Sequence, residues 1–430
     1  MKRSTGQRGM THPQQRARLR LVVTLSALAV VVPLVVFAWH VTNVDVGQAS
    51  AGQQAIGPAA YPPARRLATL PHQRAYTIER QGQGFALMAS DDPATHLLVA
   101  TLPGGFGSEA TDTIAALDLS PNQQWLAIDG MHEHGDHVWI VATTTGTLRE
   151  LPTDATGNFL HWLPDGDHFL FRPFLPLRAS DATWNPGLWI VDAASGTHVN
   201  LALPGDQPAT DLVDAAPSPD GTHIILSLTT GLGQGSTVYM ATPDGLNMHP
   251  LFQSAADVAA LAWSPNGGQI AYETIEDSTI PFRPAGLWTM AANATGQRQI
   301  ALTDGGHGFA PTWSADSSRL AFVTRLNADD SQADAVAGQL RSAVAVANVM
   351  DGTITTIAAP DQTHQPRNIA PTWQPDGSLA FTAMGASTAP GAAIAPARLW
   401  HTAPLGASLA QPHLMPMTAV QAMSVAVLVP

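Results

Sequence analysis

The hydrophobic positions between residues 75 and 430 fall in short runs that alternate with polar residues and end at tight turns. One unit recurs six times: an apolar strand, a turn of the type Ser-Pro-Asp-Gly, and a second apolar strand. In such a turn proline presets φ to about −65°, Asp or Asn closes an Asx turn, and glycine supplies a positive φ. Each unit therefore predicts a β-hairpin. The units span 117–128, 161–171, 216–226, 262–272, 312–322 and 372–381.

A third apolar strand follows each hairpin, and a glycine-containing turn then leads to a short fourth strand. Four strands per repeat are typical of the blades of a β-propeller. A tryptophan occupies the same place in four units, and we expect these indoles to pack between neighbouring sheets. The third strands are 138–142, 188–192, 238–241, 287–291, 344–348 and 399–402, and the repeated tryptophans are Trp162, Trp263, Trp313 and Trp373.

The two ends of this region predict one blade more than the six hairpins. Three strands are predicted at 75–80, 85–89 and 96–102, with no first strand before them, and 419–429 is an apolar strand with no partner after it. If the last strand completes the first sheet, the ring closes and both edge strands are hidden. We therefore predict an all-β fold, a propeller with seven four-stranded blades, with six blades as the alternative.

The repeat resembles the TolB-like, WD-repeat-like family of propeller repeats, in which Trp-Ser-Pro-Asp-Gly is followed by an Ile-Ala-Phe strand. The resemblance covers residues 75–430. The first copy departs from it by lacking the tryptophan and the glycine, and the fifth has Ala315 and Ser317 in place of proline and glycine. The resemblance implies the propeller fold but not a function, because such repeats serve binding proteins, peptidase-associated domains and assembly factors alike.

Residues 21–39 contain no charge, and their length is near the roughly 20 residues that a helix needs to cross a bilayer. Six basic residues and no acid precede them, so the positive-inside rule places the tail at 1–20 in the cytoplasm. We predict a transmembrane signal-anchor helix at 21–40, a flexible linker at 41–74, and the propeller at 75–430 outside the cytoplasm, in the periplasm or at the cell exterior. The alternative is a secreted protein, cleaved near the Ala-x-Ala-like site that ends at Ala51.

Charge and composition exclude several classes of function. The net charge is −13 although the first 20 residues are basic, and an acidic propeller argues against nucleic acid, which needs a basic surface. The absence of cysteine excludes disulfides, thiolate zinc sites and cysteine nucleophiles. No Gly-x-Ser-x-Gly elbow, P-loop, dinucleotide fingerprint or His-Glu-x-x-His motif is present. We expect no cofactor and no catalysis, but a central-channel site would leave no local motif.

The loops between second and third strands are long and irregular, whereas the turns between first and second strands are short. These two sets lie on opposite faces of a propeller, and insertions on one face of a repeat protein often mark its binding face. We therefore expect a partner to contact the long-loop face. Arginine and aromatic side chains are common interface anchors. Five of them in these loops are candidate partner contacts: Arg178, Trp184, Phe282, Arg283 and Arg325.

A dense group of possible metal ligands follows the first hairpin unit, where residues 132–137 read His-Glu-His-Gly-Asp-His. His132 and His134 share one face of a strand with this spacing, and His137 can join them from the turn. Imidazole suits zinc or a related metal, although the spacing matches no established zinc signature. The group predicts either a weak metal site or a solvated loop.

Three hypotheses for function follow. The first is a non-catalytic protein-binding or scaffold module, anchored in the membrane by residues 21–39, that recruits a protein or envelope component. The second is an accessory subunit of a larger membrane complex. The third is a propeller hydrolase or lyase whose site is assembled in the central channel.

Overall fold

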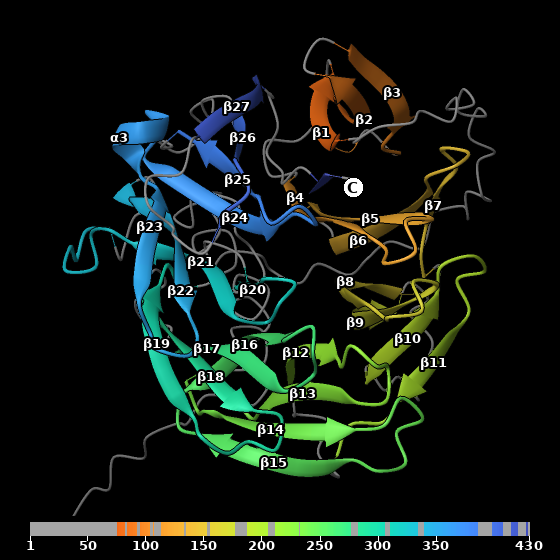
Figure 1. Ribbon diagram of the computed structural model, residues 1–430. Coiled ribbons are helices and arrows are strands. Elements are labelled where there is room, and N and C mark those ends of the chain that lie inside the picture. Colours follow the sequence, from red (N-terminus) through yellow and green to blue (C-terminus); the bar gives the residue numbers. More distant parts are fainter. Residues whose placement is uncertain are drawn as a thin grey trace, which may run out of the picture.

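The computed structural model describes residues 75–428 with interruptions, and these residues form seven four-stranded sheets arranged in a ring (Figure 1). The predicted seven-bladed, all-β propeller is confirmed, and the six-bladed alternative is wrong. The predicted tail, membrane helix and linker at 1–74 lie outside the described residues. The further segments that are not described are 82–83, 93–94, 104–105, 107–112, 133–134, 153–154, 177–186, 205–210, 232, 277–282, 306–309, 334–338, 386–397, 407–413, 420–426 and 429–430.

Each blade is a sheet in which hydrogen-bonded neighbours follow one another along the chain, except for the closing strand of blade 1. From the innermost strand outwards, blade 1 contains β28 (Val427–Leu428), β1 (Ala75–Gln81), β2 (Gly84–Asp92) and β3 (Thr95–Thr101). Blade 2 contains β4 (Thr113–Leu119), β5 (Trp125–His132), β6 (Gly135–Ala142) and β7 (Leu148–Glu150), and blade 3 contains β8 (Ala155–Trp162), β9 (His168–Pro176), β10 (Leu188–Asp192) and β11 (His198–Leu201).

The remaining four blades repeat this order. Blade 4 contains β12 (Asp211–Pro217), β13 (Ile224–Thr229), β14 (Ser236–Ala241) and β15 (His249–Ser254), and blade 5 contains β16 (Asp257–Trp263), β17 (Gln269–Ile275), β18 (Ala285–Ala291) and β19 (Arg298–Thr303). Blade 6 contains β20 (Thr312–Trp313), β21 (Arg319–Arg325), β22 (Ser342–Asn348) and β23 (Ile354–Ala358), and blade 7 contains β24 (Arg367–Trp373), β25 (Leu379–Met384), β26 (Arg398–Thr402) and β27 (Leu414–Ala419).

The hairpin turns have the geometry that their residues predict. In blade 4, the N–H of Gly221 donates to the carbonyl of Ser218 at 2.9 Å, and Gly221 adopts a φ of 69°. In blade 6, Ser317 replaces the glycine and itself adopts a φ of 60°. Such a left-handed conformation costs a residue with a Cβ about 1 kcal/mol. The repeat therefore imposes its turn even on a copy whose sequence departs from it.

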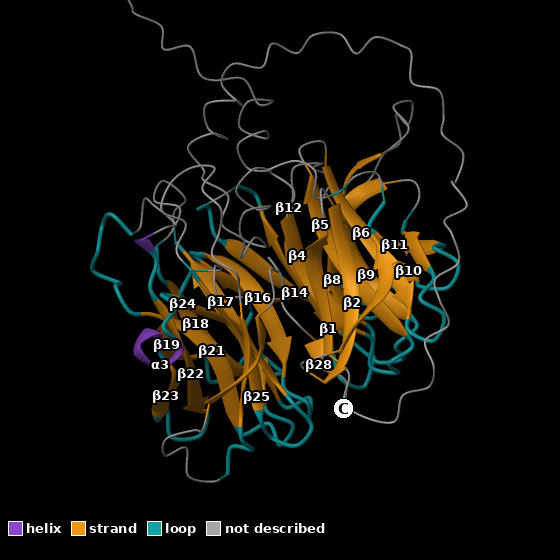
Figure 2. Ribbon diagram, turned by 90° about the horizontal axis from the view of Figure 1, so that it is seen from above, coloured by secondary structure: helices purple, strands orange, loops and turns teal. Residues whose placement is uncertain are grey.

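The strand order divides the ring into two faces. Successive strands of a blade run antiparallel, so the turns between first and second strands and those between third and fourth strands lie on one face, which we call the short-turn face. The connections between second and third strands lie on the opposite, long-loop face. Figure 2, turned by 90° from Figure 1, shows the strands running between the two faces.

The innermost strands contain β-bulges at closely similar positions. The pairing of first and second strands shifts register in β4, β8, β12, β16 and β24. Two of these bulges place an alanine in the left-handed region, Ala260 with a φ of 53° and Ala370 with a φ of 55°. A bulge interrupts the ladder and leaves backbone groups of the inner strand without their usual partners. Those groups need partners from elsewhere.

The hydrophobic core is divided among the seams between neighbouring blades. In the seam of blades 2 and 3, Phe159, Trp162 and Phe169 pack ring against ring with centroids 5.5–5.7 Å apart. Val138 and Ile140 of blade 2 belong to the same cluster and are almost fully buried. Burying one such side chain stabilises the fold by about 1.5–3 kcal/mol. The ring is therefore stabilised mainly by contacts between blades.

The ring is closed by the end of the chain. Val427 and Leu428 of β28 pair with Tyr76 and Ala75 of β1, so a C-terminal strand completes the first sheet as predicted. The predicted single strand at 419–429 needs correction, because β27 ends at Ala419 as the fourth strand of blade 7 and the closing strand is much shorter. The strands predicted at 75–80, 85–89 and 96–102 correspond to β1, β2 and β3.

Helical structure is sparse within the described part of the chain, where α3 (Pro360–Thr363) forms a single turn between blades 6 and 7. No helix among the described residues is both long enough and apolar enough to cross a membrane. The predicted span at 21–40 is not among those residues.

Candidate functional site

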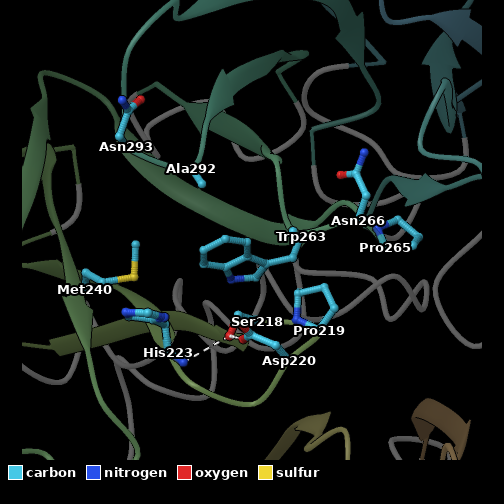
Figure 3. Close-up of a pocket in the computed structure, with 11 residues that line it drawn as sticks. Ser218, Pro219, Asp220, His223, Met240, Trp263, Pro265, Asn266, Ala292 and Asn293 are labelled. Carbon is cyan, nitrogen blue, oxygen red and sulfur yellow. Dashed lines mark hydrogen bonds between the residues drawn. The ribbon is translucent and has the colours of Figure 1, made fainter.

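A groove with a volume of about 560 Å³ lies on the short-turn face between blades 4 and 5. Its apolar wall is made by Pro219, Met240, Trp263 and Pro265. Figure 3 shows the Trp263 ring at the centre of the groove, with Met240 to one side and Pro265 to the other. Trp263 is half-buried and the two prolines are exposed, so apolar surface here is open to a ligand.

One side of the groove is formed by the Ser-Pro-Asp-Gly turn of blade 4. The Ser218 hydroxyl donates to Asp220 Oδ1 at 2.6 Å and accepts from the backbone N–H of His223 at 2.9 Å. The backbone N–H and the hydroxyl of Thr222 also donate to Asp220 Oδ1. These hydrogen bonds, that of Ser218 above all, lower the pKa of Asp220 to about 2. The groove therefore has one rim that stays negatively charged at every physiological pH.

The residue types Ser218, Asp220 and His223 occur in hydrolytic triads, but their arrangement here is different. In a triad the imidazole lies between the hydroxyl and the carboxylate and takes the proton from the hydroxyl. Here Ser218 donates directly to Asp220, and the ring Nδ1 of His223 lies 2.7 Å from the Thr222 hydroxyl. The three side chains stabilise a turn and do not form a nucleophile–base pair.

The tryptophans predicted at the repeat position lie in the seams. Each indole N–H donates to a backbone carbonyl in the preceding blade, at 3.0–3.3 Å. Trp162 and Trp313 are buried, and Trp263 and Trp373 are half-buried. The acceptors are the carbonyls of Asp118, Ala216, Ala262 and Thr312, respectively.

Buried and half-buried polar side chains bind the bulges of the innermost strands across the seams. Asp129 Oδ2 accepts the N–H of Phe159 at 3.1 Å, and Asp214 Oδ2 accepts the N–H of Leu261 at 2.7 Å. Arg172 donates to the carbonyl of Val213 at 2.8 Å and to that of Leu212, at the bulge of β12. These carboxylates and this guanidinium thus supply the partners that the bulges lack.

A second group of charges is buried between blades 5, 6 and 7. Arg325 forms an ion pair with Asp304, and both side chains are fully enclosed. Arg367, at the start of β24, is 1% exposed and interacts electrostatically with both. Burial, together with the charge of Asp304, raises the pKa of Glu273 to about 7.

Three titratable side chains lie on the innermost strands of three successive blades. They are Asp118 on β4, His161 on β8 and Asp214 on β12, and all three are half-buried. Burial raises the pKa of Asp118 to about 6 and raises that of Asp214, and the nearby His161 opposes both shifts. His161 is therefore close enough to Asp118 and to Asp214 to interact electrostatically with both.

The structure describes only two of the five candidate partner contacts, Arg283 and Arg325. Arg178, Trp184 and Phe282 lie outside the described residues. Arg283 is exposed, and its Nη1 is 3.9 Å from Glu276 Oε2, so it stays a candidate. Arg325 is not on the surface, because its side chain is enclosed with its ion-pair partner in the seam. The expectation of a surface contact at Arg325 is therefore wrong.

The predicted metal ligands are only partly described. His132 ends β5, its side chain is not described, and His134 lies outside the described residues. His137 Nδ1 is 2.5 Å from Glu150 Oε1, and its ring stacks on Trp139. Within the described ranges, no three His, Asp or Glu side chains are grouped to hold a metal ion. A site using all three histidines stays a prediction.

Sequence reasoning overlooked the charged residues within apolar strands. Asp129, Arg172 and Glu273 each follow an apolar triplet in the second strand of a repeat, at the same position of the unit. A charge at such a position is rarely buried without partners, so the pattern could have indicated bonded charges at the seams. The groove itself carries no such signal, because it arises where turns of two blades meet.

The fold defines the class of the molecule as a seven-bladed β-propeller. No protein-family model matches the sequence, and no curated protein does. TolB from Acinetobacter baumannii is a similar solved structure, with 15% identity and a TM-score of 0.45 over 66% of this chain. The match covers 63% of that TolB chain, which is less than two thirds of its length.

Two other solved structures are similar to a comparable degree. A putative TolB from Agrobacterium tumefaciens has 18% identity and a TM-score of 0.40 over 56% of this chain and 87% of its own. An oligogalacturonate lyase in complex with manganese has 16% identity and a TM-score of 0.47 over 70% of this chain and 79% of its own. Similarities of this size assign neither a family nor an activity to the present chain.

Proposed function

We propose that this chain is a non-catalytic, protein-binding propeller and that the groove between blades 4 and 5 contacts the partner. The supporting observation is the contrast between its two kinds of chemistry. Asp129, Arg172 and Asp214 bind the backbone of the neighbouring blade, whereas the two prolines of the groove are exposed and Trp263 is only half-buried. Open aromatic surface beside a charged rim is typical of interface anchors.

The proposal includes a membrane anchor. The uncharged segment 21–39, preceded by six basic residues, supports a helix that holds the propeller outside the cytoplasm. Under this proposal, alkaline extraction leaves the full chain in the membrane fraction, and protease added from the outside digests the propeller. An accessory subunit of a larger complex would in addition co-purify with integral membrane proteins.

A second candidate function is a propeller hydrolase or lyase. Its support is the trio Asp118, His161 and Asp214, which places two carboxyls and an imidazole on adjacent innermost strands. General acid–base chemistry needs groups whose pKa values lie near the working pH, and the pKa of Asp118 is about 6. Turnover of a uronate glycan or an ester that is abolished by His161→Gln would favour this candidate.

Site-specific photo-crosslinking tests the binding proposal. A photoreactive residue replaces Ala292, which lines the groove, or Val199, which is 63% exposed on the outer strand of blade 3. We expect position 292 to crosslink one discrete protein in intact cells, identified by mass spectrometry, and position 199 to crosslink none. Equal labelling at both positions, or no product at either, contradicts the proposal.

A further inference from the structure

The face that carries the groove has acidic turns in blades 3, 4, 6 and 7. Its turns contain eight aspartates that are exposed or half-buried, whereas its three arginines already donate to backbone carbonyls of the following blade or of a nearby loop. The aspartates are Asp165, Asp167, Asp192, Asp220, Asp244, Asp316, Asp351 and Asp376, and the arginines are Arg149, Arg298 and Arg319. A ligand of this face therefore meets a negative potential.

This charge is built into the repeat. In the turns that hold Asp220, Asp244 and Asp316, the hydroxyl of the residue two positions earlier donates to the carboxylate. That hydrogen bond is the main reason why the pKa of each of the three is lowered. These three carboxylates therefore stay anionic in mildly acidic as well as neutral solution, since they protonate only at low pH.

The groove adds an apolar slot to the charged face. Pro219, Trp263 and Pro265 present open carbon surface, and Asp220 lies in the same groove. We propose, resting on the proposed binding function, that the groove takes a basic, extended segment of a partner protein. An apolar side chain of that segment packs on Trp263, and an arginine or lysine faces Asp220.

Charge complementarity favours a basic segment in the groove over a second copy of this chain or an acidic peptide. A second copy of the same face would bring aspartates against aspartates, which costs free energy at close range. An acidic peptide meets the same repulsion. Arginine and lysine gain from the anionic rim, and their aliphatic stems can lie on the proline and tryptophan surfaces.

The test uses short fluorescein-labelled peptides and the full chain in mild detergent, with binding followed by fluorescence anisotropy. The probe alternates arginine with leucine and proline. One control peptide replaces each arginine by glutamate, and another replaces each leucine by serine. We expect saturable binding of the probe, weakened by added salt, and loss of most binding with either control.

Matched protein variants place the binding in the groove. Asp220→Asn keeps the Oδ1 acceptor that the turn uses, so it removes a charge and preserves the fold. Asp376→Asn makes the same change in the corresponding turn of blade 7, where the N–H of Ser378 donates to the aspartate. We expect Asp220→Asn to weaken probe binding roughly twofold to fivefold and Asp376→Asn to leave it unchanged.

Three outcomes overturn the inference: no saturable binding of the probe, equal binding of the glutamate peptide, or equal effects of the two variants. Each is distinguishable from failure of the binding function itself. A partner that crosslinks elsewhere on the propeller while the probe does not bind would leave the proposed function standing and remove only the basic occupant of the groove.

Discussion

At the residue scale, the repeated tryptophan connects neighbouring blades by a hydrogen bond as well as by packing. In blade 6, Trp313 is 8% exposed and its indole N–H donates to the carbonyl of Ala262 at 3.0 Å. Trp139 in blade 2 is also buried, at 2% exposed, but its indole N–H has no hydrogen-bond partner among the described residues. Comparing the two tryptophans therefore distinguishes the contribution of the indole hydrogen bond from that of burying the ring.

Replacing these residues by phenylalanine measures that hydrogen bond. Trp313→Phe loses ring volume and leaves the Ala262 carbonyl without its donor, so we expect it to lower the free energy of unfolding by about 1 kcal/mol more than Trp139→Phe does. Urea denaturation followed by circular dichroism provides the comparison. Equal losses in the two variants would show that the indole N–H does not contribute.

At the element scale, the hairpins could be predicted from the sequence but the bulges could not. The turn at 218–221 is specified by its own four residues, so local chemistry suffices. The bulge in β16 depends on Asp214 of the preceding blade, whose carboxylate accepts the N–H of Leu261. A contact between residues of different repeats has no local pattern, and the groove was overlooked for the same reason.

The buried acid of β17 gives the seam of blades 5 and 6 a pH dependence. The pKa of Glu273 is raised from 4.5 to about 7, so between these values the folded protein keeps a proton that the unfolded chain has lost. Stability therefore falls as the pH rises through this interval, by up to about 3 kcal/mol from this group.

Glu273→Gln should make the free energy of unfolding depend less on pH. We expect its free energy of unfolding, measured in urea at several pH values from 5 to 8 (roughly the interval in which Glu273 titrates), to decline less than that of the unmodified protein. Glu276→Gln removes an exposed carboxyl, 75% accessible, and serves as the control for lost charge. The expectation fails if both variants show the slope of the unmodified protein.

At the scale of the whole molecule, the seven-bladed ring could be predicted by counting strands, whereas the groove of the proposed binding site could not. The long loops predicted a partner-binding site on their own face, but most of the candidate contacts in them lie outside the described residues. Arg325 is enclosed in the interior, where it forms an ion pair with Asp304. The groove lies on the opposite face, where short turns of two blades meet. Loop length indicates where the fold tolerates insertions, and it does not indicate where apolar surface is exposed to solvent.

Ring closure predicts a large effect of a small deletion. Removing residues 427–430 takes away β28 and exposes the edge of β1, so we expect the melting temperature to fall by at least roughly 5 °C and aggregation to increase. Removing 429–430 alone leaves the pairs of Tyr76 with Val427 and Ala75 with Leu428 in place. Differential scanning calorimetry compares the two truncations, and identical melting would contradict a closing role for β28.

The closing strand also sets the order of events when the protein is made. Blade 1 is synthesised first among the blades, but its innermost strand is made last, because β28 ends at Leu428. Until that strand emerges, the edge of β1 stays open to proteases, chaperones and other nascent chains. The propeller therefore reaches its finished state after translation of the ring is complete, and a newly made molecule passes through an open stage that quality control can recognise.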